Sequence, residues 1–296
     1  MKFAFIRDHK SQFPVESMCR VLQVSPGAFY AWIKRPLCAH QQRDQELMHK
    51  IEQVFHESRG RYGSPRVHAE LRAGGHRCSP KRVARLMRER HLAVKPKRGV
   101  VATTDSKHTQ PVAQNVLNRR FGVEQVETIN RSWVGDITYI AVQGGWLYLA
   151  VVLDVKSRRV IGWSMSQSLE QELVADALVM AQKARLSRPT DGTLLFHSDR
   201  GSQYAATATR EWLEQWELVQ SMSRRGNCWD NAVAESFFAT LKKELVHREH
   251  YQTPEQAKAS LFYYIEVFYN RQRRHSALGF ISPNDYEQTL LSNSPS

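Results

Sequence analysis

The first hundred residues carry apolar side chains at helical spacing, interrupted by short breaks. A first apolar series ends at Leu22, Ser25-Pro26-Gly27 breaks the pattern, and a second series begins at Phe29. Helix, tight turn and helix are the outline of a helix-turn-helix, which we assign to residues 1–58. The apolar positions of the two series are Val15, Met18, Cys19, Leu22, Phe29, Tyr30 and Trp32.

A second helical pair is predicted over residues 59–100, and it is strongly basic. Gly74-Gly75 ends its first helix, and Ser79 is a typical N-cap for the next one. That helix combines an apolar stripe with a cationic face, as a recognition helix in the major groove requires, although a solvated amphipathic helix looks much the same. The apolar positions are Val67, Leu71, Val83, Leu86 and Met87, and the cationic positions are Lys81, Arg82, Arg85, Arg88 and Arg90.

From Trp133 onward the pattern changes to strand-length runs rich in β-branched and aromatic residues. The runs "SWVGDITYIAV" and "GWLYLAVVLDV" are joined by a hairpin turn at residues 143–145, and "RRVIGWSMS" completes an antiparallel meander. An amphipathic helix, a strand "GTLLFHSD", a second helix, a strand "VQSMS" and two further helices follow. We therefore predict an α/β fold with a mixed five-stranded sheet, flanking helices and all-α segments in front.

Charge is divided unevenly along the chain, which has a net charge of +13. Residues 1–120 hold 24 Lys and Arg against nine Asp and Glu, whereas the remainder holds 18 against 20. A polycationic front indicates attraction to a polyanion, most often nucleic acid, with a solubilising surface as the alternative. We read 101–128 as a linker, 129–290 as the core that follows it, and 291–296 as a tail.

Other classes of protein are disfavoured by composition. The four cysteines lack CxxC spacing, which fits a reducing compartment and argues against a disulfide framework or a zinc module. No apolar run approaches the ~20 residues needed to span a bilayer, and the first residues are too charged for a signal peptide. We therefore expect a soluble intracellular protein.

Three carboxylates stand at positions that carry chemistry. Asp136 lies within a strand, where burying a carboxylate costs several kcal/mol unless a metal ion or a partner charge compensates. Asp199 lies at the mouth of the fourth strand, and Glu235 lies in a helix. Taken singly, Asp199 could be a turn residue and Glu235 a solvated helical acid, just as we assign Asp154 to a turn.

The helix of Glu235 can be read by angle, at 100° per residue. Asn231, Glu235 and Lys242 share one stripe, beside an apolar face that includes Phe237 and Leu241. The helix can therefore pack on the sheet and still present Glu235 at its border. Acids from a strand, a strand end and a helix can converge, and such a cluster binds Mg²⁺ through oxygen. Two ions on shared carboxylates can clamp an in-line phosphoryl displacement.

Together, these blocks resemble a known family. "WVGDITYI", "HSDRGSQY" and "NCWDNAVAESFFATLKKEL" resemble the three acidic blocks of DDE transposases with a retroviral-integrase-like core. The 35 residues between the last two acids and the basic residue seven after the glutamate belong to that pattern. "YNRQRRHSALGFISPNDY" and "YGSPRVHAELRAGG" resemble the insertion-sequence-three family, and more narrowly its catalytic second-frame product.

The resemblance implies a ribonuclease-H-like core in which Asp136, Asp199 and Glu235 hold two Mg²⁺ ions, with Mn²⁺ as a substitute. It implies cleavage at the ends of a mobile element and attack of the freed 3′-OH on DNA, with no covalent enzyme intermediate and no ATP. Lys242 is expected to contact DNA near the scissile phosphate, and Asn231 to orient Glu235 or the DNA. His197 is either a supporting residue of the metal site or purely structural.

The resemblance also implies partners. These are double-stranded DNA (element ends and target), further copies of the chain on DNA, and an upstream-frame protein of the same element. The expected location is the bacterial cytosol, in association with the nucleoid and away from membranes. Arg273 or Arg274 is expected to contact phosphate, although a plain cationic helix end is the alternative.

Other readings remain open at this stage. A tyrosine recombinase would use Arg271, Arg274, His275 and Tyr286, but it leaves the three acids unexplained. A helix-turn-helix regulator with an inactive nuclease-like domain would bind DNA without cutting it. A stand-alone nuclease or resolvase would share the chemistry of the core.

Overall fold

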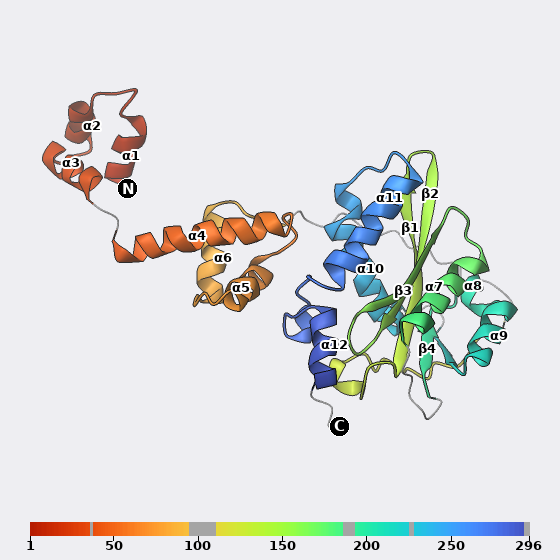
Figure 1. The fold of residues 1–296 in the computed structure, drawn as a ribbon. Helices are drawn as coiled ribbons and strands as arrows, with labels where there is room; N and C mark the ends of the chain where they lie inside the picture. Colours follow the sequence, from red (N-terminus) through yellow and green to blue (C-terminus); the bar gives the residue numbers. More distant parts are fainter. Residues whose placement is uncertain (36–37, 95–110, 186–192, 225–227, 293–296) are drawn as a thin grey trace. The chain divides into compact units, whose positions relative to one another are not determined.

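A computed structural model describes residues 1–35, 38–94, 111–185, 193–224 and 228–292 (Figure 1). The chain divides into two compact units, Met1–Ala93 and Val94–Ser296, and each is described by itself. None of the described helices is both long enough and apolar enough to cross a membrane.

The first unit begins with three short helices, α1 (Lys2–His9), α2 (Val15–Val21) and α3 (Pro26–Lys34). Ile6, Met18, Cys19 and Phe29 form their common core. The break at Ser25 is the start of α3, because the Ser25 side chain accepts a hydrogen bond from the Ala28 N–H and Pro26 occupies the first helical turn. The predicted apolar spacing is confirmed, except that Tyr30 is half exposed.

A 19-residue helix, α4 (Ala39–Glu57), follows and was not predicted. It packs with α5 (Ser64–Ala73) and α6 (Pro80–Glu89), whose apolar stripes and Ser79 cap match the prediction. Ion pairs from Asp44 of α4 to Arg82 and Arg85 of α6 join the same elements. The boundary we placed between residues 58 and 59 therefore falls inside one group of helices, and is corrected.

The second unit contains a five-stranded sheet. Strands β1 (Ser132–Val142), β2 (Gly145–Asp154) and β3 (Val160–Ser166) form the predicted antiparallel meander. The β1–β2 turn is two residues long, and Gly144 there has a φ of 84°, which glycine adopts without strain. Strand β4 (Leu195–Ser198) pairs with β1 in parallel, and β5 (Val219–Met222) pairs with β4 in parallel. The order β3-β2-β1-β4-β5 confirms the mixed, ribonuclease-H-like sheet.

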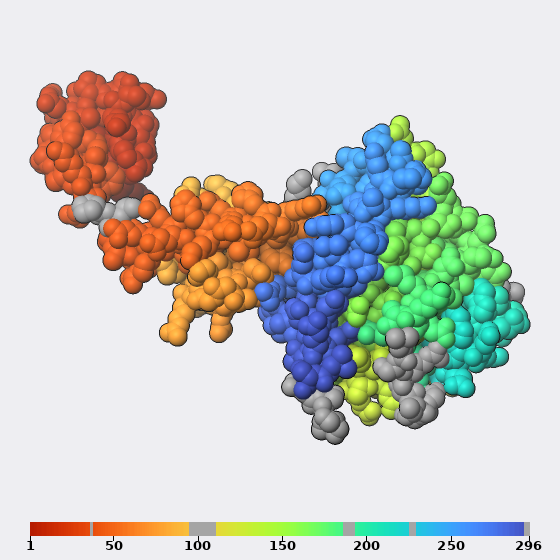
Figure 2. Space-filling view, in the orientation of Figure 1, coloured from red at the N-terminus to blue at the C-terminus, as the bar shows by residue number. Residues whose placement is uncertain are grey.

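Helices cover both faces of this sheet (Figure 1). The main core lies under α7 (Gln171–Ala184), where Leu178 and Ala181 meet Trp133 and Phe196. Helices α8 (Ser202–Ala205) and α9 (Thr207–Gln215) connect β4 to β5. Helices α10 (Ala232–Glu244) and α11 (Pro254–Phe262) pack against β1. In Figure 2 the C-terminal segments, in blue, lie directly against the green atoms of the middle of the chain.

The segment before the sheet departs from the expected linker. Within residues 101–128, positions 101–110 lie outside the described residues, but the rest packs on the core. The backbone N–H groups of Val116 and Leu117 both donate to Ser221 Oγ of β5, and Leu117 is buried. A short turn, η1 (Val123–Gln125), continues the segment to the sheet. The expectation of a linker is therefore corrected for residues 111–128.

The chain ends in a group of short elements that pack on the core. A 3₁₀ turn η3 (Val246–Arg248) follows α10, and α11 runs directly into a π-helix, η4 (Tyr263–Tyr269). A turn η5 (Ser276–Leu278) leads to α12 (Pro283–Ser292), where Glu287 pairs with Arg159 and Arg185. The last residues of the expected tail, 293–296, lie outside the described residues.

Candidate active site

Asp136 lies in the middle of β1, opposite Val151 of β2. Its neighbour Gly135 faces the main core, where an added Cβ would lie 2.5 Å from Phe196 Cζ. Only glycine fits there without a shift of the ring, and alternation along the strand sends Asp136 to the opposite face, toward α10. Asp136 is half-buried, and its Oδ1 accepts a hydrogen bond of 2.8 Å from the Ile137 N–H.

Asp199 is brought beside Asp136 by the register of two parallel strands. Val134 of β1 pairs with His197 of β4, and each aspartate lies two residues further along its strand. Asp199 is the first residue after β4, so it stands where the strand ends next to β1. Its Oδ1 accepts a hydrogen bond of 2.9 Å from the Gly201 N–H, which fixes the turn.

Glu235 is supplied by α10, which is anchored to β1. A 3₁₀ turn, η2 (Cys228–Asn231), leads into this helix, and the Asn231 Nδ2 donates to the Gly135 carbonyl at 3.2 Å. Glu235 lies in the first turn of α10 and is exposed, while Phe237 and Leu241 are buried as predicted.

The three acids influence one another electrostatically. Burial raises the pKa of Asp136 well above its usual range, and the charges of Asp199 and Glu235 raise it further. Burial also raises the pKa of Glu235, and Asp199 adds to that shift. Lys242 belongs to the same cluster: burial lowers the pKa of its ammonium group, and the charge of Asp136 opposes that change.

The site fits a divalent cation in donor type and in charge. Carboxylate oxygens are the ligands that Mg²⁺ and Mn²⁺ prefer, and a bound cation would stabilise the ionised form of carboxylates whose pKa values are raised by burial first and by their mutual repulsion second. In the part of the chain that the structure describes, however, no three His, Cys, Asp or Glu side chains are grouped closely enough to hold a metal as they stand. Of the three acids, Glu235 is the exposed one, and exposed side chains change rotamer readily.

His197 lies in β4, two residues before Asp199, as a buried and neutral residue. Its Nδ1 lies 2.8 Å from Ser221 Oγ, and its Nε2 lies 3.2 Å from Ser223 Oγ. Ser221 Oγ already accepts two backbone N–H groups, so its hydroxyl donates to Nδ1 and the proton of the ring is on Nε2. Burial lowers the pKa of His197 to about 4. Of the two roles considered, these contacts support the structural one, with His197 holding β4 to β5 next to Asp199.

Two residues of the site were missed in the sequence. Asp230 is fully buried in η2 and binds three side chains, those of Asn115, Arg119 and Arg224. The pKa of Asp230 lies far below its usual range, chiefly because its carboxylate accepts hydrogen bonds from the Arg224 guanidinium. Tyr204 of α8 is buried next to the aspartates: burial raises the pKa of its hydroxyl, and the charges of Asp136 and Asp199 add to the shift. Tyr204 follows Asp199 by five residues in the quoted block, which was the available signal.

The predicted phosphate contacts near the C-terminus divide in two. Arg273 is 4% exposed, and its Nε and Nη2 donate to the two carboxylate oxygens of Glu244, at 2.9 and 2.8 Å. The expectation that Arg273 contacts phosphate is corrected, because its guanidinium is buried against a carboxylate. Arg274 is half-buried, and its Nη1 donates to the Phe280 carbonyl.

The cationic face of α6 also divides. Arg82 and Arg85 are engaged by Asp44 of α4, and Arg85 also bonds Glu89. Lys81 and Arg88 are exposed, and the described residues offer them no ion-pair partner. These two side chains are therefore the available cations of the helix.

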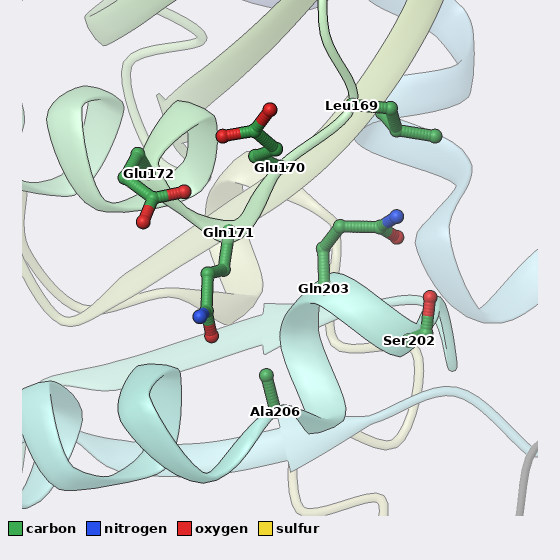
Figure 3. Close-up of a pocket in the computed structure, with 7 residues that line it drawn as sticks. All are labelled: Leu169, Glu170, Gln171, Glu172, Ser202, Gln203 and Ala206. Carbon is green, nitrogen blue, oxygen red and sulfur yellow. The ribbon is translucent and has the colours of Figure 1, made fainter.

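A shallow pocket lies in the same unit, and Asp136, Asp199 and Glu235 are not among its lining residues. It is formed where the start of α7 approaches α8, and its side chains are drawn in Figure 3. The lining residues are Leu169, Glu170, Gln171, Glu172, Ser202, Gln203 and Ala206.

Comparisons with protein families define the class. A family described as integrase core domain matches residues 127–228, which include Asp136 and Asp199. A second integrase core domain model matches residues 235–291 and begins at Glu235. An HTH-like domain matches residues 42–99, which span α4, α5 and α6. The chain is thus an integrase-core enzyme of the DDE polynucleotidyl transferase class with a helix-turn-helix-like domain.

Full-length relatives identify the family. The chain is 41% identical over 293 residues to the transposase InsF for insertion sequence IS3A of Escherichia coli K12, covering 98% of this chain and 100% of that protein. It is 42% identical over 271 residues to the 31 kDa protein of insertion element IS600 of Shigella sonnei, covering 92% and 97%. The chain belongs to the IS3 family of transposases.

Solved structures are more distant in sequence. The catalytic core domain of HTLV-2 integrase, in complex with magnesium, is 16% identical with a TM-score of 0.41, over 54% of this chain and 97% of that one.

Family membership removes support from the regulator and tyrosine recombinase readings. The segment offered for a recombinase, which ends at Tyr286, lies inside the second integrase core match.

Proposed function

We propose that this transposase cuts DNA at the ends of its insertion sequence and joins the freed 3′-OH to DNA, using Asp136, Asp199 and Glu235. The observation that carries the proposal is the pairing of Val134 with His197, which brings Asp136 beside Asp199 on neighbouring parallel strands. The shared electrostatic influence of Asp199 and Glu235 on Asp136 supports the third member.

The three carboxylates would hold two Mg²⁺ ions, or Mn²⁺ in their place. When bound, the ions supply Lewis-acid activation of the attacking oxygen and stabilise charge on the leaving oxygen of an in-line displacement. The protein's own contribution is positioning, since β1 and the β4 end fix two ligands and α10 brings the third. Partial burial keeps the local dielectric low, which strengthens each charge interaction.

Lys242 and Asn231 support this arrangement. Lys242 is a half-buried cation within the acid cluster, and we assign it to the phosphate next to the cleaved bond. Asn231 is 3% exposed and ties α10 to β1 through the Gly135 carbonyl. We therefore assign Asn231 to orienting Glu235.

DNA contacts outside the active site are assigned to the basic unit. Lys81 and Arg88 of α6 are exposed cations suited to phosphate, whereas Arg82 and Arg85 would contact DNA only from within their ion pairs with Asp44. Arg274 is assigned to phosphate near the core. The partners proposed are double-stranded DNA, further copies of the chain on DNA and an upstream-frame protein of the same element, in the bacterial cytosol and at the nucleoid.

A strand-joining assay tests the proposal. The full chain is incubated with labelled element ends and Mg²⁺, with and without the upstream-frame protein, and joined products are measured. Asp136→Asn removes a ligand, so we expect joining to fall by more than the about 10- to 100-fold that loss of an outer-shell metal partner costs. DNA binding should be retained.

Asp176→Asn is the matched control, because Asp176 is an exposed acid on α7 and should leave joining unchanged. Full joining by Asp136→Asn would contradict the proposed metal site. Cleaved ends without joined products would point to a nuclease that uses water, and a protein–DNA phosphotyrosine would point to a recombinase.

A further inference from the structure

A large aromatic side chain stands exposed next to the proposed active site. Trp229 is 69% exposed, more than the other tryptophan recorded as exposed among the described residues, Trp146 at 54%. A tryptophan ring has a large apolar face and an N–H donor, so a partner that covers Trp229 would gain from removing that face from water.

The two residues that follow Trp229 keep its side chain from turning inward. Asp230, the next residue, is fully buried and bonded to Asn115, Arg119 and Arg224. Asn231, the residue after, is buried and bonded to β1. The short 3₁₀ turn is therefore fixed at two successive positions, and it holds Trp229 outward.

The position and charge around Trp229 suit a nucleic acid strand. From the rise of a 3₁₀ turn followed by an α-helix, Trp229 and Glu235 are separated by about 10 Å along the chain axis, the length of about three stacked base pairs. Arg119 and Arg224, whose side chains are 45% and 49% exposed, both pair with Asp230, the residue after Trp229, so this turn and its partners carry one net positive charge. An exposed aromatic ring flanked by a cationic surface is the arrangement that binds single-stranded nucleic acid.

We propose that Trp229 stacks on an unpaired base at the DNA end, within a few nucleotides of the phosphate held by the three acids. This inference rests on the proposed active site, since it takes its distance from Glu235. Stacking is tolerant of sequence because every base has a π-face, so Trp229 would hold a frayed end open without choosing its sequence. The alternative occupant of the same surface is a second protein chain.

Binding of two DNA probes to the full-length protein tests this inference. One probe is a blunt duplex, and the other is the same duplex with a short single-stranded thymidine overhang, both in buffer without divalent cations. We expect Trp229→Ala to weaken binding of the overhang probe by about 5- to 150-fold, and binding of the blunt probe much less. Trp229→Phe should restore most of the difference.

Trp146→Ala is the matched control, because Trp146 is an exposed tryptophan whose strand partner Ala141 lies five residues from Asp136, about 17 Å along β1. A photoreactive 5-iododeoxyuridine in the overhang should cross-link to the peptide that contains Trp229. Equal loss on both probes, no loss on either, or a cross-link elsewhere would overturn the inference. A change in oligomeric state with DNA binding intact would overturn it in favour of a protein contact.

The outcome is separable from that of the proposed function. Asp136→Asn should leave the overhang preference intact, because it removes a carboxylate and not the stacking surface. If Asp136→Asn kept full joining while Trp229→Ala lost the overhang preference, the metal site would fail and the stacking site would stand.

Discussion

At the scale of single residues, His197 is a buried polar group whose two ring nitrogens both have partners, two residues before Asp199. Its neutral ring is hydrogen-bonded to Ser221 of β5 and to Ser223 just after that strand, so protonation would place a second donor against the Ser221 hydroxyl. The lowered pKa, about 4 in the folded protein, has a direct consequence for stability.

We predict that the integrase core loses stability as the pH falls from about 6.5 to about 4. In this window the unfolded chain binds the proton and the folded one does not, so stability rises with pH and is complete above 6.5. The part due to His197 is about 3 kcal/mol at most. Calorimetric unfolding of the full chain across this range should show the loss, and His197→Gln should flatten it. An unchanged pH profile in the variant would contradict the assignment.

Part of the candidate site could be proposed residue by residue. Asp136 was selected because a carboxylate inside an apolar strand needs compensation, and Asp199 because it follows a buried strand. Asp230 was not found, since its role depends on side chains of Asn115 and Arg119, more than a hundred residues away. Arg273 was misassigned because a basic run looks the same whether its guanidinium groups face solvent or a buried carboxylate.

At the scale of elements, α10 is fixed at both ends. Asn231 ties its start to β1, and Glu244 at its last turn accepts hydrogen bonds from Arg273 and the Tyr264 hydroxyl. Both members of the Glu244–Arg273 pair are buried. The position of Glu235 along the sheet therefore depends on contacts at each end of its helix.

We predict that Arg273→Met lowers the free energy of unfolding by about 3–5 kcal/mol, because it leaves the Glu244 carboxylate buried without its cation. Denaturant unfolding of the full chain measures the change. Adding Glu244→Leu should recover most of the loss, since neither charge is then buried alone. If Arg273→Met were as stable as the parent and only DNA binding fell, Arg273 would be a phosphate contact after all.

The elements themselves followed from the sequence to different degrees. The order of strands and helices in the core was predictable because runs such as Leu147–Leu153 have strand length and clear turns between them. Helix α4 was missed because its buried positions, Leu47, Met48 and Ile51, are sparse among glutamines and charges. The packing of residues 111–128 was also missed, since polar irregular sequence carries no signal for a segment held by backbone bonds.

At the scale of the whole molecule, the proposal assigns DNA binding chiefly to the basic first unit and the chemistry to the second unit. Most of the cationic excess lies before residue 121, whereas the three acids lie after it. Ion pairing within the first unit leaves fewer cations available to bind DNA phosphates, because Arg82 and Arg85 form ion pairs with Asp44.

We predict that Lys81→Ala and Arg88→Ala each weaken DNA binding uniformly across sequences and reduce the slope of log affinity against log salt by about 1. Anisotropy titrations over a range of salt concentrations measure both quantities. Lys183→Ala, an exposed lysine on α7, is the control and should alter neither. An unchanged slope in both α6 variants would place the DNA-binding surface elsewhere on the unit.

The three side chains that bind Asp230 set a practical limit on where this enzyme can be truncated. Two of its three partner side chains, Asn115 and Arg119, come from the segment that precedes the sheet. A catalytic fragment that starts at residue 129 would lack both, and the buried Asp230 carboxylate would keep Arg224 alone of these three partners. A fragment begun at residue 111 would keep all three. A suitable N-terminal boundary for a catalytic fragment therefore lies well before β1. A fragment that starts at the sheet would lose contacts that hold the turn leading into α10, the helix that carries Glu235.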